Sequence, residues 1–335
     1  MTSRETVYHS LNFSLKGRIP RHLWLLNWAE QRFPDDLKHI QSTFPDDIVH
    51  SPAPYLIPLI KSGDPYEPGR YTDEWGCTFE NIHQGVHGEI RVPLIESLNE
   101  IDKLRLPEEL LSLDKEAVNK FCRQSDKFVL QATCARPFER LQFLRKSDNL
   151  YIDLAEESAE FYEILRKVHE MYLKEMQVWA DTEIDALFFM DDWGSQRSLL
   201  ISPAQWKRIF KPLYKDYIDI AHSSGKRIFM HSDGYILDII PELIDLGLDA
   251  LNSQIFCMGL DRLANLKGKL CFWGEIDRQF LLSRGTKSEI QAAVESVKEN
   301  LCRDGGVIAQ CEFGPGHKPE NIYTVFETWD KLPIE

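Results

Sequence analysis

The feature that most constrains the fold is the segment 226–254, KRIFMHSDGYILDIIPELIDLGLDALNSQ, which has the pattern strand, helix, strand. Residues 226–230 are an apolar run typical of a strand, and the polar residues 231–234 end it. Apolar residues then recur at helical spacing as far as Leu246, and Gly247 is placed to end the helix in a left-handed conformation. A unit of this length makes its two strands parallel. The segment therefore predicts an α/β fold.

The same alternation recurs on both sides of this segment. Further strands are predicted at 128–133, 186–190, 270–273 and 307–310, and helices at 137–145, 156–179, 202–222, 287–302 and 319–329. Ser202 and Thr286 stand where helix N-caps are expected. Strand-to-strand steps of about 30–45 residues are typical of βα repeats and favour a single (β/α)8 TIM barrel. An open doubly wound sheet is the alternative, but no GxGxxG follows an early strand.

The first 107 residues do not follow the repeat, and we expect an irregular N-terminal extension there that belongs to the same domain, 1–335. Within it, 21–28 has the pattern of a short strand. The stretch 48–60 is interrupted by prolines, so we expect a loop or an edge strand. Residues 73–92 predict a hairpin with glycines at its turns.

Composition excludes several classes of function. The formal net charge of -14 argues against a nucleic-acid partner and against electrostatic docking on an anionic membrane. The seven cysteines contain no CxxC pair, so neither a disulfide framework nor a zinc ribbon is expected. The sequence shows no signal-like apolar segment and no apolar run of membrane length. We expect a cytoplasmic enzyme that acts on a small molecule, with a homodimer as the oligomeric state to test.

Five predicted strands end in polar residues. These are Asp191 and Asp192, His231 and Asp233, Asn252 and Gln254, Glu275 and Asp277, and Cys311 and Glu312. In a parallel barrel the carboxyl ends of all strands meet on one face, where such folds keep their active sites. The set therefore predicts a functional site. The alternative is that loops begin with polar residues in any case, because helix caps need them.

Three of these residues predict a metal site. His231 and Asp233 are two apart on an extended chain, so their side chains point to the same side. Together with Cys311 they offer nitrogen, carboxylate and thiolate ligands, a set suited to Zn²⁺ with an open fourth position. Each has an alternative: His231 as a core imidazole, Cys311 as a small buried apolar residue, and Asp233 as a helix cap.

Two further acids are candidates for catalysis. Asp191 and Asp192 would share a proton if they lie close together, and Asp192 is our candidate for a fourth ligand or a general base. A capping carboxylate is the alternative for Asp192. Glu275 is the second candidate, with Arg278 as a partner for it or for Asp277.

The remaining candidates concern substrate binding. Asn252, Gln254 and Asp277 follow strands and would contact polar groups of a substrate, although Asp277 is placed equally well to satisfy loop N–H groups. Trp28 and Trp193, with Trp24 and Trp75, would line an apolar mouth for a planar substrate; filling the core is the alternative. His317, in a rigid Gly-Pro turn, is expected to face solvent.

With these residues in view, the chain resembles the uroporphyrinogen decarboxylase superfamily. The resemblance rests on DDWGSQRSLLISPAQWKRIFKPLY, IFMHSDGYILDIIPELIDLGLDALNSQ, FWGEIDRQ and VIAQCEFGPGHKPENI, in this order, with DEWGC at 73–77 in the N-terminal third. It implies a TIM barrel. The superfamily contains the haem-pathway decarboxylase and zinc-dependent methyltransferases that act on corrinoid proteins.

The methyltransferase branch implies a zinc site and a corrinoid as methyl carrier. That branch holds zinc through His-x-Cys and a later Cys, and the matching positions here are His231, Asp233 and Cys311. One thiolate is thus replaced by a carboxylate, which leaves a harder metal centre or marks a site that has been abandoned.

The decarboxylase branch is similar in fold, but its arginine-rich N-terminal segment of the RQAGR type has no counterpart here. Arg18, Arg21 and Arg32 are the nearest basic residues, and their spacing differs from that pattern. A substrate with many carboxylates needs such guanidinium groups, so decarboxylation of uroporphyrinogen itself is disfavoured.

Three functions follow from the resemblance. The first is a zinc-dependent methyltransferase that moves a methyl group between a corrinoid and a thiol or another nucleophile. The second is a metal-free carboxy-lyase in which Asp192 or Asp233 stabilises a cationic intermediate. The third is a non-catalytic barrel that binds a corrinoid or a tetrapyrrole, or a methyl-carrier protein.

Overall fold

A parallel eight-stranded barrel forms the centre of the molecule. The computed structural model describes residues 1–335, and its strands are arranged in the order β1-β11-β10-β9-β8-β7-β6-β2. They are β1 (Arg21–Leu25), β2 (Ile48–His50), β6 (Phe128–Leu130), β7 (Ala186–Met190), β8 (Arg227–Ser232), β9 (Ala250–Ser253), β10 (Cys271–Trp273) and β11 (Val307–Phe313). Every ladder in this sheet is parallel. The predicted TIM barrel is confirmed.

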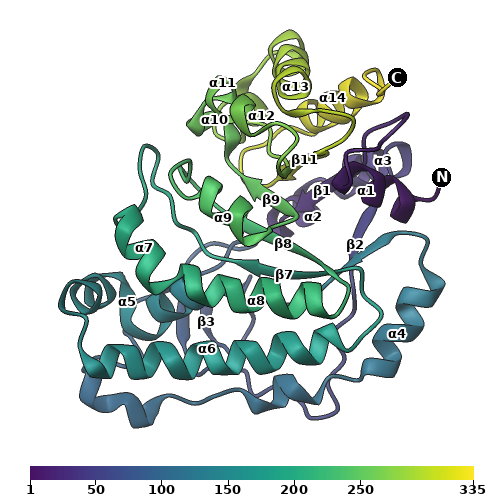
Figure 1. Cartoon of the computed structure of the whole chain (residues 1–335). Helices are drawn as coiled ribbons and strands as arrows, with labels where there is room; N and C mark the ends of the chain where they lie inside the picture. Colours follow the sequence, from purple (N-terminus) through teal and green to yellow (C-terminus); the bar gives the residue numbers. More distant parts are fainter.

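Helices surround the strands, with α6 and α8 on one side and α13 and α14 on another (Figure 1). They are α1 (Ser3–Leu11), α2 (Asn27–Arg32), α3 (Pro34–Thr43), α4 (Lys115–Gln124), α5 (Pro137–Glu156), α6 (Ala159–Ala180), α7 (Pro203–Ile209), α8 (Lys211–Ser223), α9 (Ile240–Leu246), α10 (Ile255–Met258), α11 (Leu260–Leu263), α12 (Leu281–Arg284), α13 (Lys287–Leu301) and α14 (Pro319–Asp330). The predicted caps Ser202 and Thr286 each accept a backbone N–H of the helix that follows.

The N-terminal third is more regular than the sequence predicts. It contains three helices and supplies two barrel strands, β1 and β2, whose seam is bridged where the Asp47 N–H donates to the Arg21 carbonyl at 2.9 Å. The strand β2 ends at His50, just before the prolines that suggested a loop. The predicted hairpin is a three-stranded antiparallel sheet of β3 (Gly69–Thr72), β4 (Thr78–Asn81) and β5 (Glu89–Ile90).

The barrel strands have an inner and an outer face, and each packs into a different core. The inner core contains side chains such as Phe229, Trp273 and Ile308, whereas the larger outer core lies between the strands and the helices. Both faces are covered, which explains the continuous apolar runs that predicted these strands. Because successive side chains of a strand point to opposite faces, every second residue faces the barrel interior and the residues between them face the helices.

The segment 226–254 folds as predicted except at the start of its helix. Strand β8 continues to Ser232, so His231 is part of the strand, and α9 begins at Ile240 after turns. Gly247 ends α9 with φ +93°, the left-handed conformation expected of it. The apolar helical face is therefore real, but its first turn is not regular helix.

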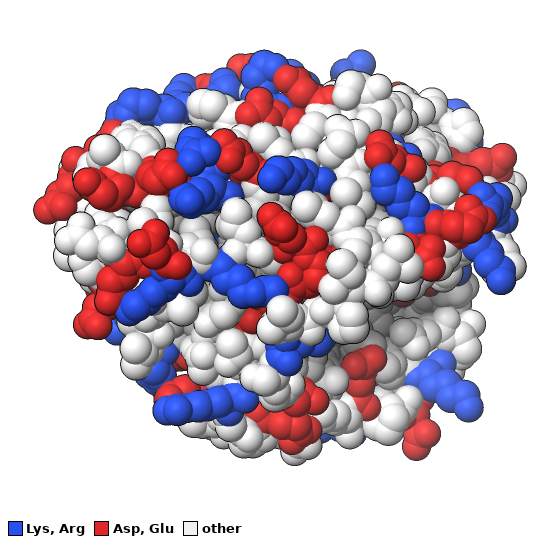
Figure 2. All heavy atoms as spheres, turned by 90° about the horizontal axis from the view of Figure 1, so that it is seen from below, with Lys and Arg blue, Asp and Glu red and all other residues white.

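No helix of the structure is both long and apolar enough to cross a bilayer. On the face seen in Figure 2, basic and acidic side chains are interspersed, without an extended patch of one sign. This distribution offers no basic track for a polyanion on that face.

Candidate active site

A histidine and two carboxylates meet at the carboxyl ends of β7 and β8. His231 is the next-to-last residue of β8, and Asp192 and Asp233 lie in the loops just beyond the two strands. Nε2 of His231 is 3.5 Å from Oδ1 of Asp192 and 3.4 Å from Oδ1 of Asp233. One ligand atom from each residue lies within 4.8 Å of the other two. We call Asp192, His231 and Asp233 the acid–histidine group.

Two glycines allow the loops after β7 and β8 to approach this closely. The N–H of Gly194 donates to the Asp233 carbonyl at 3.0 Å, and the Asp233 N–H donates to Oδ1 of Asp192 at 2.9 Å. A Cβ atom on Gly234, which has φ +77°, would overlap the carbonyl of Gly194. The DDWG and HSDG sequences therefore bring the two acids together.

Asn252, predicted to contact substrate, orients His231 instead. Nδ1 of His231 is 2.6 Å from Oδ1 of Asn252, and the Asn252 amide donates to the Trp273 carbonyl. This arrangement places the proton of a neutral imidazole on Nδ1 and leaves the Nε2 lone pair directed at the two carboxylates. Burial lowers the pKa of His231, but the nearby carboxylates, first among them Asp192, outweigh it and the net shift is upward.

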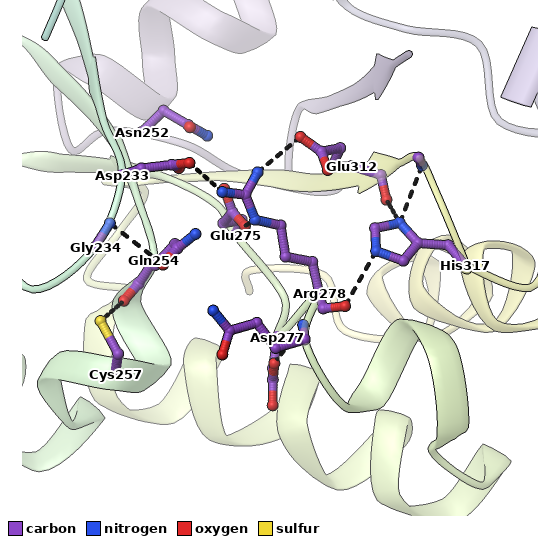
Figure 3. Close-up of polar contacts among 12 residues, drawn as sticks. Asp233, Gly234, Asn252, Gln254, Cys257, Glu275, Asp277, Arg278, Glu312 and His317 are labelled. Atoms are coloured by element: carbon purple, nitrogen blue, oxygen red, sulfur yellow. Dashed lines mark hydrogen bonds and ion pairs between the residues drawn. The ribbon is translucent and has the colours of Figure 1, made fainter. Parts of the chain in front are cut away.

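Arg278 contacts Asp233, one of the two carboxylates of the acid–histidine group, and also Glu275 and Glu312 (Figure 3). Its guanidinium donates to Oδ2 of Asp233 and, at 2.8 Å, to Glu312; its Nε is 3.2 Å from Oε2 of Glu275. Glu275, a predicted catalytic residue, is 2 % exposed, and burial raises its pKa to about 8. A neutral Glu275 at this position is able to donate a proton.

Cys311 is not part of this cluster, so the expected convergence of His231, Asp233 and Cys311 does not occur. The alternation along β11 directs Ile308, and with it Glu312, to the barrel interior and turns Cys311 outward. Cys311 is fully buried in the outer core, where burial raises its pKa. The structure places Asp192 where the sequence predicted Cys311.

Gln254 and Asp277, two predicted substrate ligands, line a small cavity of about 200 Å³ beside Glu275 and Arg278. Oε1 of Gln254 accepts the Gly234 N–H at 3.2 Å. Oδ1 of Asp277 accepts the N–H groups of Gln279 and Phe280, the loop role that was its alternative. Neither contact tests substrate binding.

The tryptophans do not form one apolar mouth. Trp193 is fully buried, stacks on Phe138 at 4.1 Å between ring centroids and donates to the Tyr214 hydroxyl at 2.6 Å. Trp28 lies in α2 under the guanidinium of Arg32. Trp193 thus has the core-filling role that was its alternative, and substrate contact by Trp28 stays a prediction. Trp24, in contrast, packs its ring 4.8 Å from that of His231.

His317 is buried, not solvent-facing as predicted. Its Nδ1 accepts the Gly314 N–H at 3.0 Å, and its Nε2 lies 3.0 Å from the Arg278 carbonyl. It thereby ties the loop after β11 to the loop after β10 (Figure 3) and supports the position of Arg278.

Sequence reasoning missed the other side of the barrel mouth, between β6, α5 and the sheet β3–β5. A cavity of about 510 Å³ lies there, lined among others by Trp75, Arg136 and Glu175. Burial raises the pKa of Glu175 to about 7. The rule that drew attention to polar residues after other strands applies equally to Thr133, Cys134 and Arg136, which follow β6.

The acid–histidine group suits a divalent metal ion. Oδ1 of Asp233 is buried and has no hydrogen-bond partner, and the Nε2 lone pair of His231 points at the same space. One imidazole and two carboxylates form a ligand set found for Zn²⁺, with positions left for a substrate. Asn252 supplies the outer hydrogen bond that metal-binding histidines commonly have.

Of two solved structures similar to this chain, the first supports the fold. A solved structure described as a methyltransferase from Methanosarcina mazei aligns with a TM-score of 0.67 and 14% identity, covering 99% of each chain. The 3-keto-D-glucoside 4-epimerase YcjR from E. coli aligns with a TM-score of 0.41 and 11% identity, over 67% of this chain and 86% of the other. No curated protein sequence matches the chain.

The family model of uroporphyrinogen decarboxylase matches residues 72–332, which span most of the barrel and the acid–histidine group. The resemblance noted in the sequence is thereby confirmed. This chain belongs to the uroporphyrinogen decarboxylase family.

Proposed function

We propose that this protein is a metal-dependent methyltransferase that passes a methyl group from a corrinoid to a small nucleophile such as a thiol. The observation that carries the proposal is the acid–histidine group, with Asp233 Oδ1 buried and unpartnered beside Nε2 of His231. Supporting it, the Methanosarcina mazei structure with the same fold is described as a methyltransferase. A corrinoid protein and a second copy of this chain are the partners that the proposal includes.

In this proposal Asp192, His231 and Asp233 hold Zn²⁺. The bound metal would lower the pKa of an acceptor thiol and hold it as a thiolate. Asn252 keeps His231 in the tautomer that exposes Nε2, and Arg278 limits the negative charge of the carboxylates around it. Glu275, neutral at pH 7 because burial raises its pKa to about 8, is the group placed to exchange a proton with the acceptor.

The test is an assay of methyl transfer from methylcobalamin to a panel of small thiols. The formation of cob(I)alamin and of the methyl thioether is measured. The thiol loses its proton and gains the methyl group, so the two products form in equal amounts. We expect turnover that chelator abolishes and Zn²⁺ restores, and at least a hundredfold loss in His231→Ala. Turnover that persists in fully metal-free protein would overturn the proposal.

A metal-free carboxy-lyase is the second candidate, because one observation favours it. Arg278 already provides a cation to Asp233, Glu275 and Glu312, as a metal ion would. Carbon dioxide release that is insensitive to chelator but lost in Asp192→Asn would favour this function over methyl transfer.

A further inference from the structure

The cavity of about 510 Å³ near the acid–histidine group is enclosed by four parts of the fold. It lies under the sheet β3–β5 and is bounded by the end of β6 and by α5 and α6. Aromatic side chains such as Phe79 and Phe143 line it. Such a space suits a small organic molecule with an apolar body.

Arg136, which precedes α5, is unusual in this cavity because its side-chain hydrogen-bond partners are sulfur atoms. Nη2 of Arg136 contacts Sγ of Cys134 at 2.9 Å and Sδ of Met190 at 3.2 Å. The nearest carboxylate, Glu139, is 4.0 Å away and makes no hydrogen bond to it. A guanidinium has five N–H donors, and sulfur is a weak acceptor. Arg136 is half-buried and has no carboxylate as a hydrogen-bond partner.

Arg140, the second arginine of the cavity, shows what a satisfied guanidinium looks like here. Its Nη1 donates to Oδ2 of Asp73 at 2.5 Å, and its Nε donates to the Tyr172 hydroxyl at 3.3 Å. It also lies over the ring of Trp75 at 4.9 Å. Arg136 has no comparable set, and 28% of its side-chain surface remains exposed where it lines the cavity.

A cationic ligand fits this cavity less well. The ring faces of Trp75 and Phe143 that would hold an ammonium group are taken by Arg140, at 4.9 and 5.2 Å. Four acids line the cavity, and two of them, Asp73 and Glu74, lie 2.5 and 3.9 Å from Arg140. Glu175 accepts the hydroxyl of Thr133 at 2.7 Å, and Oε2 of Glu139 is buried, 4.0 Å from Arg136. Of the two arginines that line the cavity, Arg136 is the one without a hydrogen-bonded carboxylate, and its complement is an anion.

We propose that this cavity binds a small organic acid whose carboxylate pairs with Arg136 and whose apolar body lies against Phe79 and Phe143. The planar guanidinium offers two parallel N–H groups to a carboxylate. Met190, which Arg136 touches, is in register with His231, so the bound acid lies beside the acid–histidine group. The acid as substrate of the transfer rests on the proposed function; its binding to the cavity does not.

The test is calorimetric titration of the metal-free protein, without any methyl carrier, with benzoate, phenylacetate and hydrocinnamate, each beside its neutral primary amide. We expect at least one acid to bind with a Kd of about 1 mM or below, and its amide at least tenfold more weakly. Because no turnover is measured, failure here is distinct from failure of methyl transfer.

Three variants decide whether Arg136 is responsible. Arg136→Gln is expected to weaken the acid at least tenfold and to leave the amide unchanged, while Arg136→Lys, which keeps the charge without the planar fork, gives an intermediate loss. Arg284→Gln, at an exposed arginine of α12, is the control and binds as wild type does. Melting temperatures check that each variant is folded. Binding of none of the acids, equal binding of acid and amide, or an unchanged affinity in Arg136→Gln overturns the proposal.

Discussion

The two sides of the barrel mouth differ in how their charges are balanced. At the ends of β8, β10 and β11, three acidic side chains contact the single guanidinium of Arg278, and burial raises the pKa of one of them, Glu275, to about 8. At the end of β6, the guanidinium of Arg136 has two sulfur atoms as its nearest hydrogen-bond partners. In our proposals the first side binds a cation and the second an anion. A substrate between them would meet a metal site at one end and an anchor for its acid group at the other.

The largest effect is expected from a substitution that separates the loops after β7 and β8. In Gly234→Ala the new methyl group overlaps the Gly194 carbonyl, so the loops that hold Asp192 and Asp233 must separate. We expect the free energy of unfolding to fall by about 3 kcal/mol or more. Urea unfolding followed by circular dichroism measures it.

Gly225→Ala is the matched control for that substitution. Gly225 also has a positive φ, +69°, but nothing lies within 4 Å of its added Cβ. We therefore expect its free energy of unfolding to fall by only about 1 kcal/mol, the cost of placing alanine in the left-handed conformation. Equal losses in the two variants would show that the contact between the loops does not hold the acids together.

The second prediction removes the internal cation. Arg278→Gln leaves Asp233, Glu275 and Glu312 without their shared partner, and we expect a loss of roughly 2 kcal/mol in the free energy of unfolding. Because Asp233 is then free, Zn²⁺ should bind about tenfold more tightly than in wild type. Unfolding with and without Zn²⁺ measures both effects, and Arg284→Gln serves as control. Weaker binding of Zn²⁺ in Arg278→Gln would mean that Arg278 supports the metal site and does not compete with it.

The third prediction concerns Glu175, which lines the cavity on the other side of the barrel mouth. Burial raises the pKa of Glu175 to about 7, above its value in the unfolded chain, so the folded state binds this proton more tightly. The stability that protonation contributes is present at low pH and is lost as the pH rises through about 7. Between pH 5.5 and 8.5 this loss amounts to about 2 kcal/mol.

Glu175→Gln keeps the shape of the protonated acid and cannot ionise. The amount by which its free energy of unfolding exceeds that of wild type should therefore grow by about 2 kcal/mol between pH 5.5 and pH 8.5. The two proteins should match only below about pH 4, where Glu175 is protonated in the unfolded chain as well. A constant difference between the two proteins across this range would assign the effect to packing and not to ionisation.

The sequence was most informative where parallel strands alternate with helices. Between β7 and α14 each apolar run became a strand and each periodic segment a helix, because strands covered on both faces show as uninterrupted apolar runs. In the first 107 residues the same reasoning was less specific. It left 48–60 as a loop or an edge strand, and β2, which stands at one end of the strand order, has three residues, too few to establish a period. The glycine contact between positions 194 and 234 also depends on tertiary structure that no local pattern reveals.

The site was predicted in part. His231, Asp233 and Asp192 follow from strand ends and from the two-residue spacing, and the structure brings them together. Cys311 was misplaced because successive side chains of β11 point alternately into the barrel and outward. All residues of β11 are buried, so its sequence does not show which of them face the barrel interior. Arg136 was missed because a lone arginine after a strand gives no sign of lacking a partner.

The central claim is that Asp192, His231 and Asp233 bind a divalent metal ion without Cys311. Calorimetric titration of Zn²⁺ into metal-free wild type, His231→Ala, Asp233→Asn and Cys311→Ala tests it directly. We predict one ion per chain in wild type and in Cys311→Ala, with a loss of affinity of at least a hundredfold in the other two variants. No binding to wild type, or a loss confined to Cys311→Ala, would contradict the claim.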